Sequence, residues 1–382
     1  MKILYVYTAL LTQGGVDRVL TVKANYLADR LGHEVWMVTD SQAGRPLVFP
    51  LSPKVHHVDL HTDFDEQYHH GIVRRYFVYH RLMRQYRRRL TDLLMQVRPD
   101  IVCTTLGREM DFLTDIHDGS CKVGESHIAK PFCRNLHLME ARGFPYNIVA
   151  RHWRRKQERA VAQLDELVVL TQRDAESWAS VRQAKVIANP VTVVESVEAD
   201  IVASRIVVAV GRMSEQKALD RLVRVWATVT RLHPEWQLQL WGEGDEQPAL
   251  QRLIDTLGIG STCRLMGTTN DIASVYASAS IYAMTSRFEG FPLVLIEAMT
   301  CGLPVVAMDC PTGPGEIIDD GSNGLLVPDG DEPAFAVALS RLMSDSELRS
   351  RLAAQARADA VARYGLDATM QRWEEMFERL KH

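Results

Sequence analysis

The sequence lacks the features that mark disulfide-rich, membrane-spanning and zinc-binding proteins. Its six cysteines among 382 residues form no CxxC pair and no metal-ligand spacing, so we expect reduced thiols in a cytosolic protein. No window approaches the ~20 apolar residues that a membrane span requires. The apolar run at residues 1–7 is too short for a signal peptide. The histidines show no HExxH-like spacing, and we expect no metal site.

A strong excess of one charge is also missing. The net charge is −4, and charged residues make up 24% of the chain. Residues 1–180 hold 25 Lys and Arg against 21 Asp and Glu, whereas the remainder holds 19 against 27. This asymmetry suggests different partners for the two halves, but the positive excess is too small to indicate nucleic acid. The length and the hydrophobic content of 46% fit a globular protein of two domains.

The chain has no complete dinucleotide-binding fingerprint. Gly14 and Gly15 follow a predicted first strand, but they are not part of a GxGxxG motif, and no acidic residue is well placed to bind a ribose. A dehydrogenase is therefore a weak hypothesis. Asp63 and Asp65 form a DxD motif of the kind that binds a metal-diphosphate in some sugar transferases. No clear strand ends directly before it, so we assign it no metal.

The sequence does contain a regular alternation of short apolar runs and longer helical patterns, which is typical of parallel βαβ units. The alternation stops at residues 189–192, which precede a polar, acidic stretch over 195–200, and it restarts at a strand over 205–211. We therefore predict an α/β fold with two Rossmann-like, doubly wound domains, 1–190 and 191–364, that face a ligand-binding cleft.

A helix predicted over residues 72–98 is unusually rich in arginine. Apolar residues recur at helical spacing, from Val73 and Tyr76 to Val97, with seven arginines among them. A core helix with a solvated basic face explains this pattern, and so does a face that docks on anionic lipid headgroups. A second basic cluster at residues 151–159 favours the second interpretation slightly.

Two carboxylates, Glu289 and Glu297, flank a Gly-Phe-Pro turn that leads into an apolar helix. Pro292 suits the first position of a helix. A helix that begins near Phe291 would direct free backbone N–H groups at an anion, for which a diphosphate is the natural candidate. Because the two acids would repel a diphosphate, we expect them to contact hydroxyl groups, one on a sugar and one on a ribose.

Further candidates follow other predicted strands. Arg212 and Lys217 come after the strand over 205–211 and can converge on one phosphate group. The loop around Thr312 and Gly313 can complete a phosphate site with its backbone N–H groups. A lone His is more often structural than catalytic, but the position of His127 at the end of an apolar strand leaves the two roles about equally open.

These motifs resemble the family-four retaining glycosyltransferases of the GT-B fold. The resemblance is specific over about residues 205–330 and looser before residue 190. The segments that carry it are 286–304, 211–217, 242–245, 310–318 and 323–326, with 14–18 and 125–127 in the first half. The loop over 311–316 departs from the commoner Gly-Gly-x-x-Glu form, which leaves the donor sugar open.

The resemblance implies a role for each matching position. The catalytic positions would be Glu289, which contacts the donor sugar, His127 at the sugar or the reacting face, and Arg212 and Lys217, which hold the diphosphate. The donor would also be bound by Gly15 over the phosphates, by Glu297 on the ribose, by Gly242 and Gly267 at the base, and by the backbone of Phe291, Leu293 and Val294. A last helix at 365–382 would return to the first domain, and no metal would be required.

The expected activity is the retaining transfer of a hexosyl or N-acetylhexosaminyl group from a UDP-sugar to a glycan or lipid-linked saccharide in polysaccharide or glycoconjugate biosynthesis. The protein would be cytoplasmic and peripheral on the inner membrane face, with an anionic membrane surface as a partner and no nucleic acid. One alternative is a UDP-sugar 2-epimerase, but His127 is the only candidate for its acid/base chemistry. Another is a nucleotide-sugar-binding module without turnover.

Overall fold

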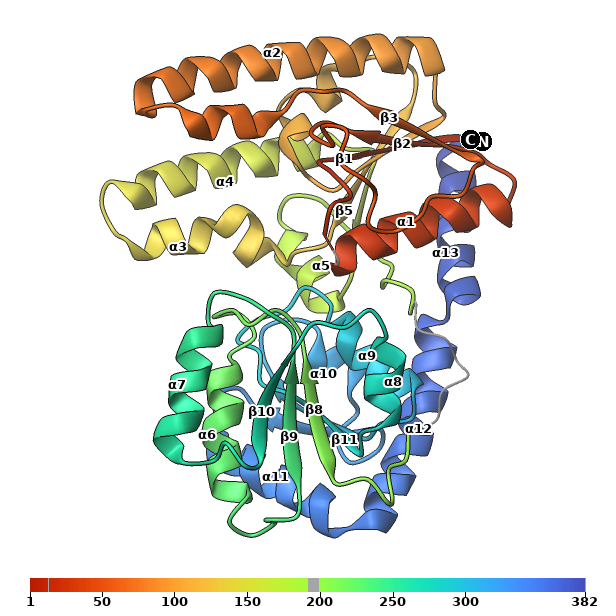
Figure 1. Cartoon of the computed structure of the whole chain (residues 1–382). Helices are drawn as coiled ribbons and strands as arrows, with labels where there is room; N and C mark the ends of the chain where they lie inside the picture. The colour runs from red at the N-terminus through yellow and green to blue at the C-terminus, as the bar shows by residue number, and fades with distance from the viewer. Residues whose placement is uncertain (13, 192–198, 382) are drawn as a thin grey trace. The chain divides into compact units, whose positions relative to one another are not determined.

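The computed structural model describes residues 1–12, 14–191 and 199–381. The chain divides into two compact units, with Met1–Ile187 and Met370–His382 in unit 1 and Ala188–Thr369 in unit 2. Each unit contains one all-parallel sheet with helices on its faces (Figure 1). Two doubly wound Rossmann-like sheets confirm the predicted fold class. The second domain predicted from the sequence covers residues 191–364, whereas unit 2 of the structure covers Ala188–Thr369.

The sheet of unit 1 has the strand order β3-β2-β1-β4-β5-β6-β7. Its strands are β1 (Lys2–Tyr7), β2 (Glu34–Thr39), β3 (Val55–Asp59), β4 (Ile101–Thr104), β5 (Cys121–Ser126), β6 (Glu166–Val169) and β7 (Lys185–Val186). The direction in which the chain adds strands reverses between β1 and β4. In sheets of this type, ligands bind at the carboxyl ends of the strands near such a reversal.

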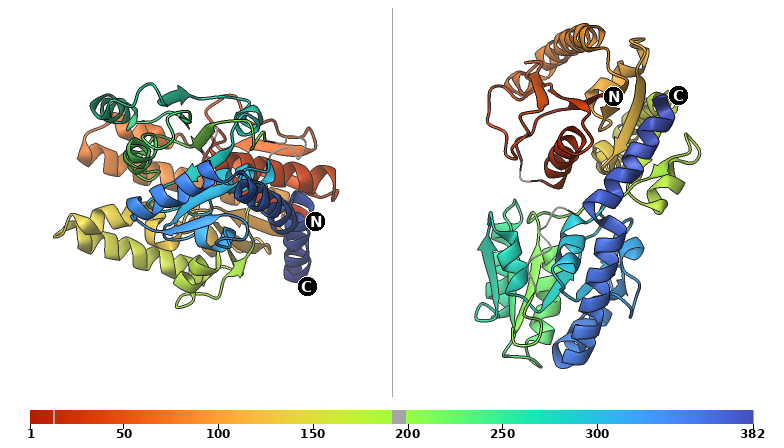
Figure 2. Two further views of the ribbon diagram at one scale, coloured as in Figure 1. Left: turned by 90° about the horizontal axis from the view of Figure 1, so that it is seen from below. Right: turned by 90° about the vertical axis from the view of Figure 1, so that its right-hand side faces the viewer.

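The helices of unit 1 are α1 (Gly15–Asp29), α2 (Ile72–Val97), α3 (Leu136–Ala141), α4 (Tyr146–Ala162) and α5 (Gln172–Trp178), with short 3-10 segments that include η1 (Phe64–His69). Most of the last helix, α13 (Leu366–Lys381), also belongs to this unit (Figure 1, Figure 2). Glu374 of α13 lies 2.7 Å from His33 Nε2, and Cys121 Sγ donates to the carbonyl of Leu380 at 3.2 Å. These contacts fix the C-terminal segment in unit 1.

Helix α2 differs from its predicted form in its first turns. Its buried side chains recur every fourth residue, beginning with Val78, Leu82 and Tyr86. Val73 and Tyr76, which the predicted apolar stripe included, are 73% and 61% exposed. The predicted apolar face is wrong in these first turns. The buried face of α2 that contains Leu82 continues towards the N-terminus through Val78 and not through Tyr76.

The sheet of unit 2 has the order β10-β9-β8-β11-β12-β13. Its strands are β8 (Ile206–Val210), β9 (Gln237–Trp241), β10 (Cys263–Gly267), β11 (Ile281–Met284), β12 (Val305–Asp309) and β13 (Leu325–Pro328). Its helices are α6 (Leu219–Val229), α7 (Gln247–Leu257), α8 (Ile272–Ala277), α9 (Leu293–Thr300), α10 (Pro314–Ile317), α11 (Glu332–Ser344) and α12 (Ser346–Tyr364). Trp226, Trp236 and Phe335 are fully buried in its core. Here the order reverses between β8 and β11.

Two further features concern the chain as a whole. All six cysteines lie in the described part of the chain and none forms a disulfide. None of the helices described is both long and apolar enough to cross a membrane.

Candidate functional site

The two strands at the reversal point of unit 2 carry the predicted phosphate and sugar residues. Lys217 follows β8, and Glu289 follows β11. Lys217 Nζ lies 2.7 Å from Glu289 Oε1, although 72 residues separate them in the sequence. The side chain of Glu289 is only 6% exposed and that of Lys217 is 20% exposed. The carboxylate is therefore buried and neutralised by a lysine from the neighbouring loop.

The loop after β12 holds the backbone of Glu289. The hydroxyl of Thr312 donates to the carbonyl of Glu289, and the amide of Glu289 donates to the carbonyl of Pro311 at 3.3 Å. Gly313 has φ +93°, and a Cβ atom there would lie 2.6 Å from Pro292 Cδ. A glycine is required at this position because the loop approaches the start of α9 so closely. Thr312 thus positions the carboxylate loop.

Helix α9 begins at Leu293, with Pro292 as its N-cap residue. The amide of Leu293 donates to the carbonyl of Phe291 at 2.9 Å. For the amides of Phe291 and Val294, the described residues provide no hydrogen-bond acceptor. These two N–H groups are therefore available donors at the positive end of the helix. The structure distinguishes them from Leu293, which the sequence grouped with them.

Glu297 lies inside α9 and is 1% exposed. The hydroxyl of Tyr276 in α8 donates to Glu297 Oε2 at 3.4 Å. Burial, together with the charges of Glu289 and Glu297, raises the pKa of Tyr282 in β11 well above its usual value. Both carboxylates thus act electrostatically on one buried phenol, which places them in the same region of unit 2.

The glycines predicted at the base site hold three loops together. The amide of Gly242 donates to the carbonyl of Gly267 at 2.7 Å, and the amide of Gly211 donates to the carbonyl of Trp241 at 2.9 Å. A Cβ atom on Gly242 would lie 2.0 Å from the carbonyl oxygen of Gly211, so no other residue fits there. The loops after β8, β9 and β10 are therefore in contact. Base binding by Gly242 and Gly267 stays a prediction.

Arg212 lies in the same loop as Lys217 but in a different environment. Its side chain is exposed, and no ion pair with it occurs among residues 1–12, 14–191 and 199–381. The next residue, Met213, fixes the backbone through a hydrogen bond from its amide to the carbonyl of Glu243 at 2.9 Å. The structure therefore brings Lys217 to Glu289 and leaves the Arg212 guanidinium accessible. Convergence of the two cations on one phosphate stays a prediction.

In unit 1, Gly15 is the first residue of α1. Asp17, in the first turn, is 2% exposed and accepts hydrogen bonds from the hydroxyl of Tyr7 at 2.7 Å and the amide of Thr12 at 2.8 Å. An anionic side chain already occupies this helix end and fixes the turn after β1. The role assigned to Gly15 stays a prediction.

His127 belongs to a buried polar cluster that the sequence did not reveal in full. Lys23 Nζ in α1 lies 2.6 Å from Glu125 Oε2, and His127 Nε2 lies 3.3 Å from the same oxygen. The three side chains are 1%, 3% and 4% exposed. Burial opposes ionisation of Glu125, but Lys23 and His127 outweigh it and lower the pKa of Glu125 below its usual value. The catalytic role of His127 stays a prediction.

Lys23 is the residue that the sequence analysis missed. Its Nζ lies 3.3 Å from the ring centroid of Trp373 in α13 and 5.5 Å from that of Tyr5 in β1. The available signal was its position on the apolar face of α1, one turn after Val19 and Leu20, both fully buried. A lysine in such a stripe requires a buried carboxylate partner.

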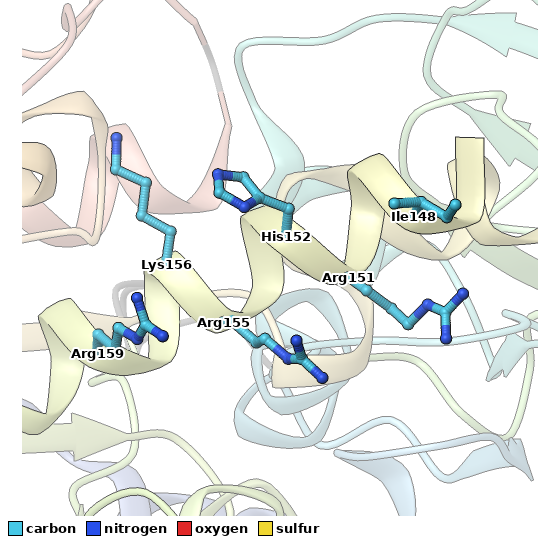
Figure 3. A pocket seen from close by; sticks show the side chains of 6 residues that line it. All are labelled: Ile148, Arg151, His152, Arg155, Lys156 and Arg159. Atoms are coloured by element: carbon cyan, nitrogen blue, oxygen red, sulfur yellow. The ribbon is translucent and has the colours of Figure 1, made fainter. Parts of the chain in front are cut away.

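The second basic cluster lies on α4 and lines a pocket of about 590 Å³ (Figure 3). The lining residues are Ile148, Arg151, His152, Arg155, Lys156 and Arg159. Lys156 pairs with Asp111 at 2.7 Å, and Arg154, outside the pocket, pairs with Glu140 at 2.9 Å. Arg155 and Arg159 have no acidic partner within the described part of the chain. The pocket is therefore electropositive.

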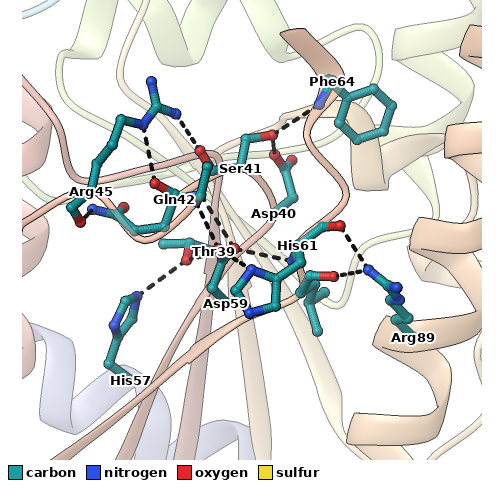
Figure 4. Close-up of polar contacts among 12 residues, drawn as sticks. Thr39, Asp40, Ser41, Gln42, Arg45, His57, Asp59, His61, Phe64 and Arg89 are labelled. Atoms are coloured by element: carbon teal, nitrogen blue, oxygen red, sulfur yellow. Dashed lines mark hydrogen bonds and ion pairs between the residues drawn. The ribbon is translucent and has the colours of Figure 1, made fainter. Parts of the chain in front are cut away.

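A polar network occupies the carboxyl ends of β2 and β3 (Figure 4). Asp59 accepts a hydrogen bond from the amide of Ala43 at 2.8 Å and lies 2.9 Å from His61 Nδ1. Asp40 is 1% exposed, accepts a hydrogen bond from the hydroxyl of Ser41, and lies 3.9 Å from Arg108 Nη1. Burial raises the pKa of Asp40 to about 7, although Ser41 and Arg108 act in the opposite direction.

A metal site is not evident in the described ranges, where no group of three or more His, Cys, Asp or Glu side chains is arranged to hold an ion. Asp63 and Asp65 of the DxD motif flank the start of η1. The expectation that the protein works without a metal is untested and stays a prediction.

Comparison with known proteins relates most of unit 2 to a family and the whole chain to a fold. Residues 198–359 match the family described as glycosyl transferases group 1. An uncharacterized glycosyltransferase of Haemophilus influenzae is 30% identical over 218 residues, which cover 56% of this chain and 62% of that protein. The amylovoran biosynthesis glycosyltransferase AmsD of Erwinia amylovora is 35% identical over 170 residues, 44% of this chain and 47% of that protein. The match thus spans less than two thirds of each relative.

A solved structure extends the likeness to nearly the whole chain. The Anabaena protein HepE, crystallised with UDP-glucose, has a TM-score of 0.74 at 18% identity, and the match covers 99% of this chain and 100% of that chain. At 18% identity, this likeness shows that the two chains share a fold, and it does not show a shared activity. The predicted GT-B fold is confirmed.

The buried pair in unit 1 gives a stability prediction. Lys23→Met leaves Glu125 buried without its cation, which should lower the free energy of unfolding by about 3–5 kcal/mol. Adding Glu125→Gln should restore most of that loss, because the orphaned charge is removed. Urea unfolding measures both. Lys2→Met, which breaks an exposed pair with Glu34, should cost about 1 kcal/mol or less. Equal losses in the single and double variants would contradict this assignment.

Asp40 gives a pH prediction. Because the pKa of Asp40 is raised in the folded state, protonated Asp40 contributes to the free energy of unfolding. That contribution is fully present below the pKa of an unfolded aspartate, about 4. It is lost as the pH rises towards 7. The wild type should therefore lose up to about 4 kcal/mol of stability between pH 4 and pH 8 relative to Asp40→Asn. Chemical unfolding of both proteins across this range measures the difference, and parallel stability curves would refute the raised pKa.

Proposed function

Residues 198–359 match the group 1 glycosyl transferases, and from this likeness we propose that the protein transfers a hexosyl or N-acetylhexosaminyl group from a UDP-sugar to a saccharide hydroxyl in the cytoplasm. The observation that carries the proposal is the Lys217–Glu289 pair at the reversal point of the unit 2 sheet. It places a cation and an acceptor carboxylate beside the amino end of α9. A diphosphate and a sugar hydroxyl are complementary to these groups.

The donor and acceptor classes draw support from the relatives. HepE was crystallised with UDP-glucose, which supports a UDP-sugar donor here. AmsD is named for amylovoran biosynthesis, which supports a glycan or lipid-linked saccharide acceptor in polysaccharide or glycoconjugate biosynthesis. The proposal leaves the identity of the transferred sugar open, and the activity test below determines it.

The proposed binding mode assigns phosphate contacts to the available donors of unit 2. Arg212 presents an accessible guanidinium, and the free amides of Phe291 and Val294 lie at the start of α9. Charge accumulates on the diphosphate as the glycosidic bond stretches, so fixed donors stabilise the transition state more than the ground state. In this scheme the cations replace a metal, and Glu297 accepts hydrogen bonds from ribose hydroxyls.

In the proposed reaction the anomeric configuration of the sugar is retained, because the diphosphate leaves and the acceptor hydroxyl attacks on the same face of the sugar. A double displacement requires a carboxylate free to attack the anomeric carbon. Glu289 instead accepts a hydrogen bond from Lys217 at 2.7 Å, which withdraws electron density from that oxygen. We assign Glu289 to a hydroxyl of the donor sugar and assign the acceptor's proton to the leaving phosphate. Analysis of the anomeric configuration of the product by NMR tests retention against inversion, and a covalent glycosyl intermediate on Glu289 would contradict the front-face route.

The activity test uses the accessible arginine. Arg212→Ala removes one donor without breaking an ion pair in the described structure, so kcat/KM should fall by about 10²-fold or more while the fold is retained. Lys217→Ala should lower kcat/KM at least as much, and it should also lower stability because Glu289 loses its cation. Release of the nucleoside diphosphate is measured with UDP-, GDP- and ADP-sugars, with and without saccharide acceptors, in EDTA.

The matched control is Arg252→Ala, which changes an exposed arginine on α7 of the same unit. It should retain wild-type rates. Wild-type rates in Arg212→Ala and Lys217→Ala would contradict the phosphate assignment, and inactivity in EDTA that is restored by a divalent cation would contradict the metal-free scheme. Conversion of the donor sugar without any acceptor would instead identify an epimerase.

A further inference from the structure

Exposed apolar side chains are unevenly distributed over the protein. Of the eighteen large apolar side chains that are exposed among the described residues, nine lie in two short segments of unit 1, residues 68–77 and 138–149. Scattered single residues of this kind are ordinary on a protein surface, whereas a concentration indicates a surface that a partner covers.

The first segment is the turn from η1 into α2. Val73, Tyr76 and Phe77 are 73%, 61% and 67% exposed. The ring of Tyr76 contacts that of Phe77 at a centroid distance of 5.7 Å, so the two form one aromatic cluster. The guanidinium of Arg75 stacks over the ring of Tyr68 at 4.4 Å. Apolar rings and cations thus occupy the same turn.

The second segment is the turn from α3 into α4. Phe144 is 80% exposed, the highest value among the exposed large apolar residues, and Ile148 and Val149 follow at 50% and 42%. Arg142 lies 5.8 Å from the ring of Tyr146, which repeats the pairing of a ring with an arginine. Both turns lie at the same end of unit 1, on the left in Figure 1 and in the left view of Figure 2. We name residues 68–77 and 138–149 the docking end.

Basic residues predominate at the docking end, and its single acidic residue, Glu140, pairs with Arg154. Residues 67–91 contain seven arginines and no Asp or Glu, and residues 141–157 contain five basic residues and no Asp or Glu. Arg74 and Arg142 are exposed and have no ion-pair partner within the described part of the chain. This surface would repel a second copy of itself, so symmetric self-association through it is unfavourable.

We propose that the docking end binds the surface of an anionic phospholipid bilayer. Aromatic rings favour the interfacial layer of a membrane, and arginines reach the lipid phosphates from there. Electrostatic attraction contributes about 1 kcal/mol for each basic residue near an anionic surface, and buried apolar side chains add to it. The inference goes beyond the proposed transfer reaction and does not depend on it, because lipid binding requires neither donor nor acceptor.

The test is co-sedimentation of the full chain with vesicles of phosphatidylcholine alone or mixed with phosphatidylglycerol. We expect binding to the anionic vesicles, weak binding to the neutral ones, and loss of binding at high salt. The combined change Arg74→Gln, Arg75→Gln and Arg142→Gln should weaken binding by about 100-fold. The combined change Tyr76→Ser, Phe77→Ser and Phe144→Ser should weaken it by about tenfold or more.

The controls are equally exposed residues of unit 2. Leu232 and Val337 are 72% and 71% exposed, and their change to Ser should leave binding unaltered, as should Arg231→Gln with Arg252→Gln. Thermal unfolding establishes that each variant is folded. Absence of binding to anionic vesicles at low salt would overturn the proposal, as would equal losses in the docking-end and control variants. Self-association or capture of an acidic protein without lipid binding would also overturn it.

Discussion

A buried carboxylate requires a nearby cation, and in unit 2 this requirement connects the two strands at which the sheet reverses direction. Glu289 follows β11 and is 5% exposed, so an unpaired negative charge there would cost several kcal/mol. Lys217, from the loop after β8, meets it at 2.7 Å. Thr312 holds the backbone of Glu289 from the loop after β12. The roles that we propose for Lys217 and Glu289 depend on this arrangement of loops around one charge pair.

Unit 1 contains a pair of the same kind. Lys23 meets Glu125 at 2.6 Å, and His127 lies 3.3 Å from the same carboxylate. Trp373 of α13 lies 3.3 Å from the ammonium of Lys23, so the C-terminal segment contributes to the environment of Glu125. In both units, an acidic residue at the carboxyl end of a strand is neutralised by a lysine from another element. Such buried charges restrict the chain to one local arrangement.

Helices and strands, which form between residues close in sequence, could be predicted, whereas contacts between residues far apart in the sequence could not. The helix over 72–98 and the strand over 205–211 were predicted to within one residue of the observed bounds, Ile72–Val97 and Ile206–Val210, because apolar periodicity suffices for them. Helix α4 was missed because its basic residues concealed the pattern. Lys23–Glu125 depends on contacts between α1 and β5, which no local pattern specifies. The Lys217–Glu289 pair was likewise missed, although both residues were chosen, because their register follows from the strand order.

The central claim is that unit 2 binds a nucleotide diphosphate through arginine, lysine and helix amides without a metal ion. The most direct measurement is a crystal structure of the protein with UDP in the presence of EDTA. The account predicts both phosphates within hydrogen-bond distance of Arg212, Lys217 and the amides of Phe291 and Val294. Phosphates bound elsewhere in the chain, or nucleotide binding only after a divalent cation is added, would contradict it.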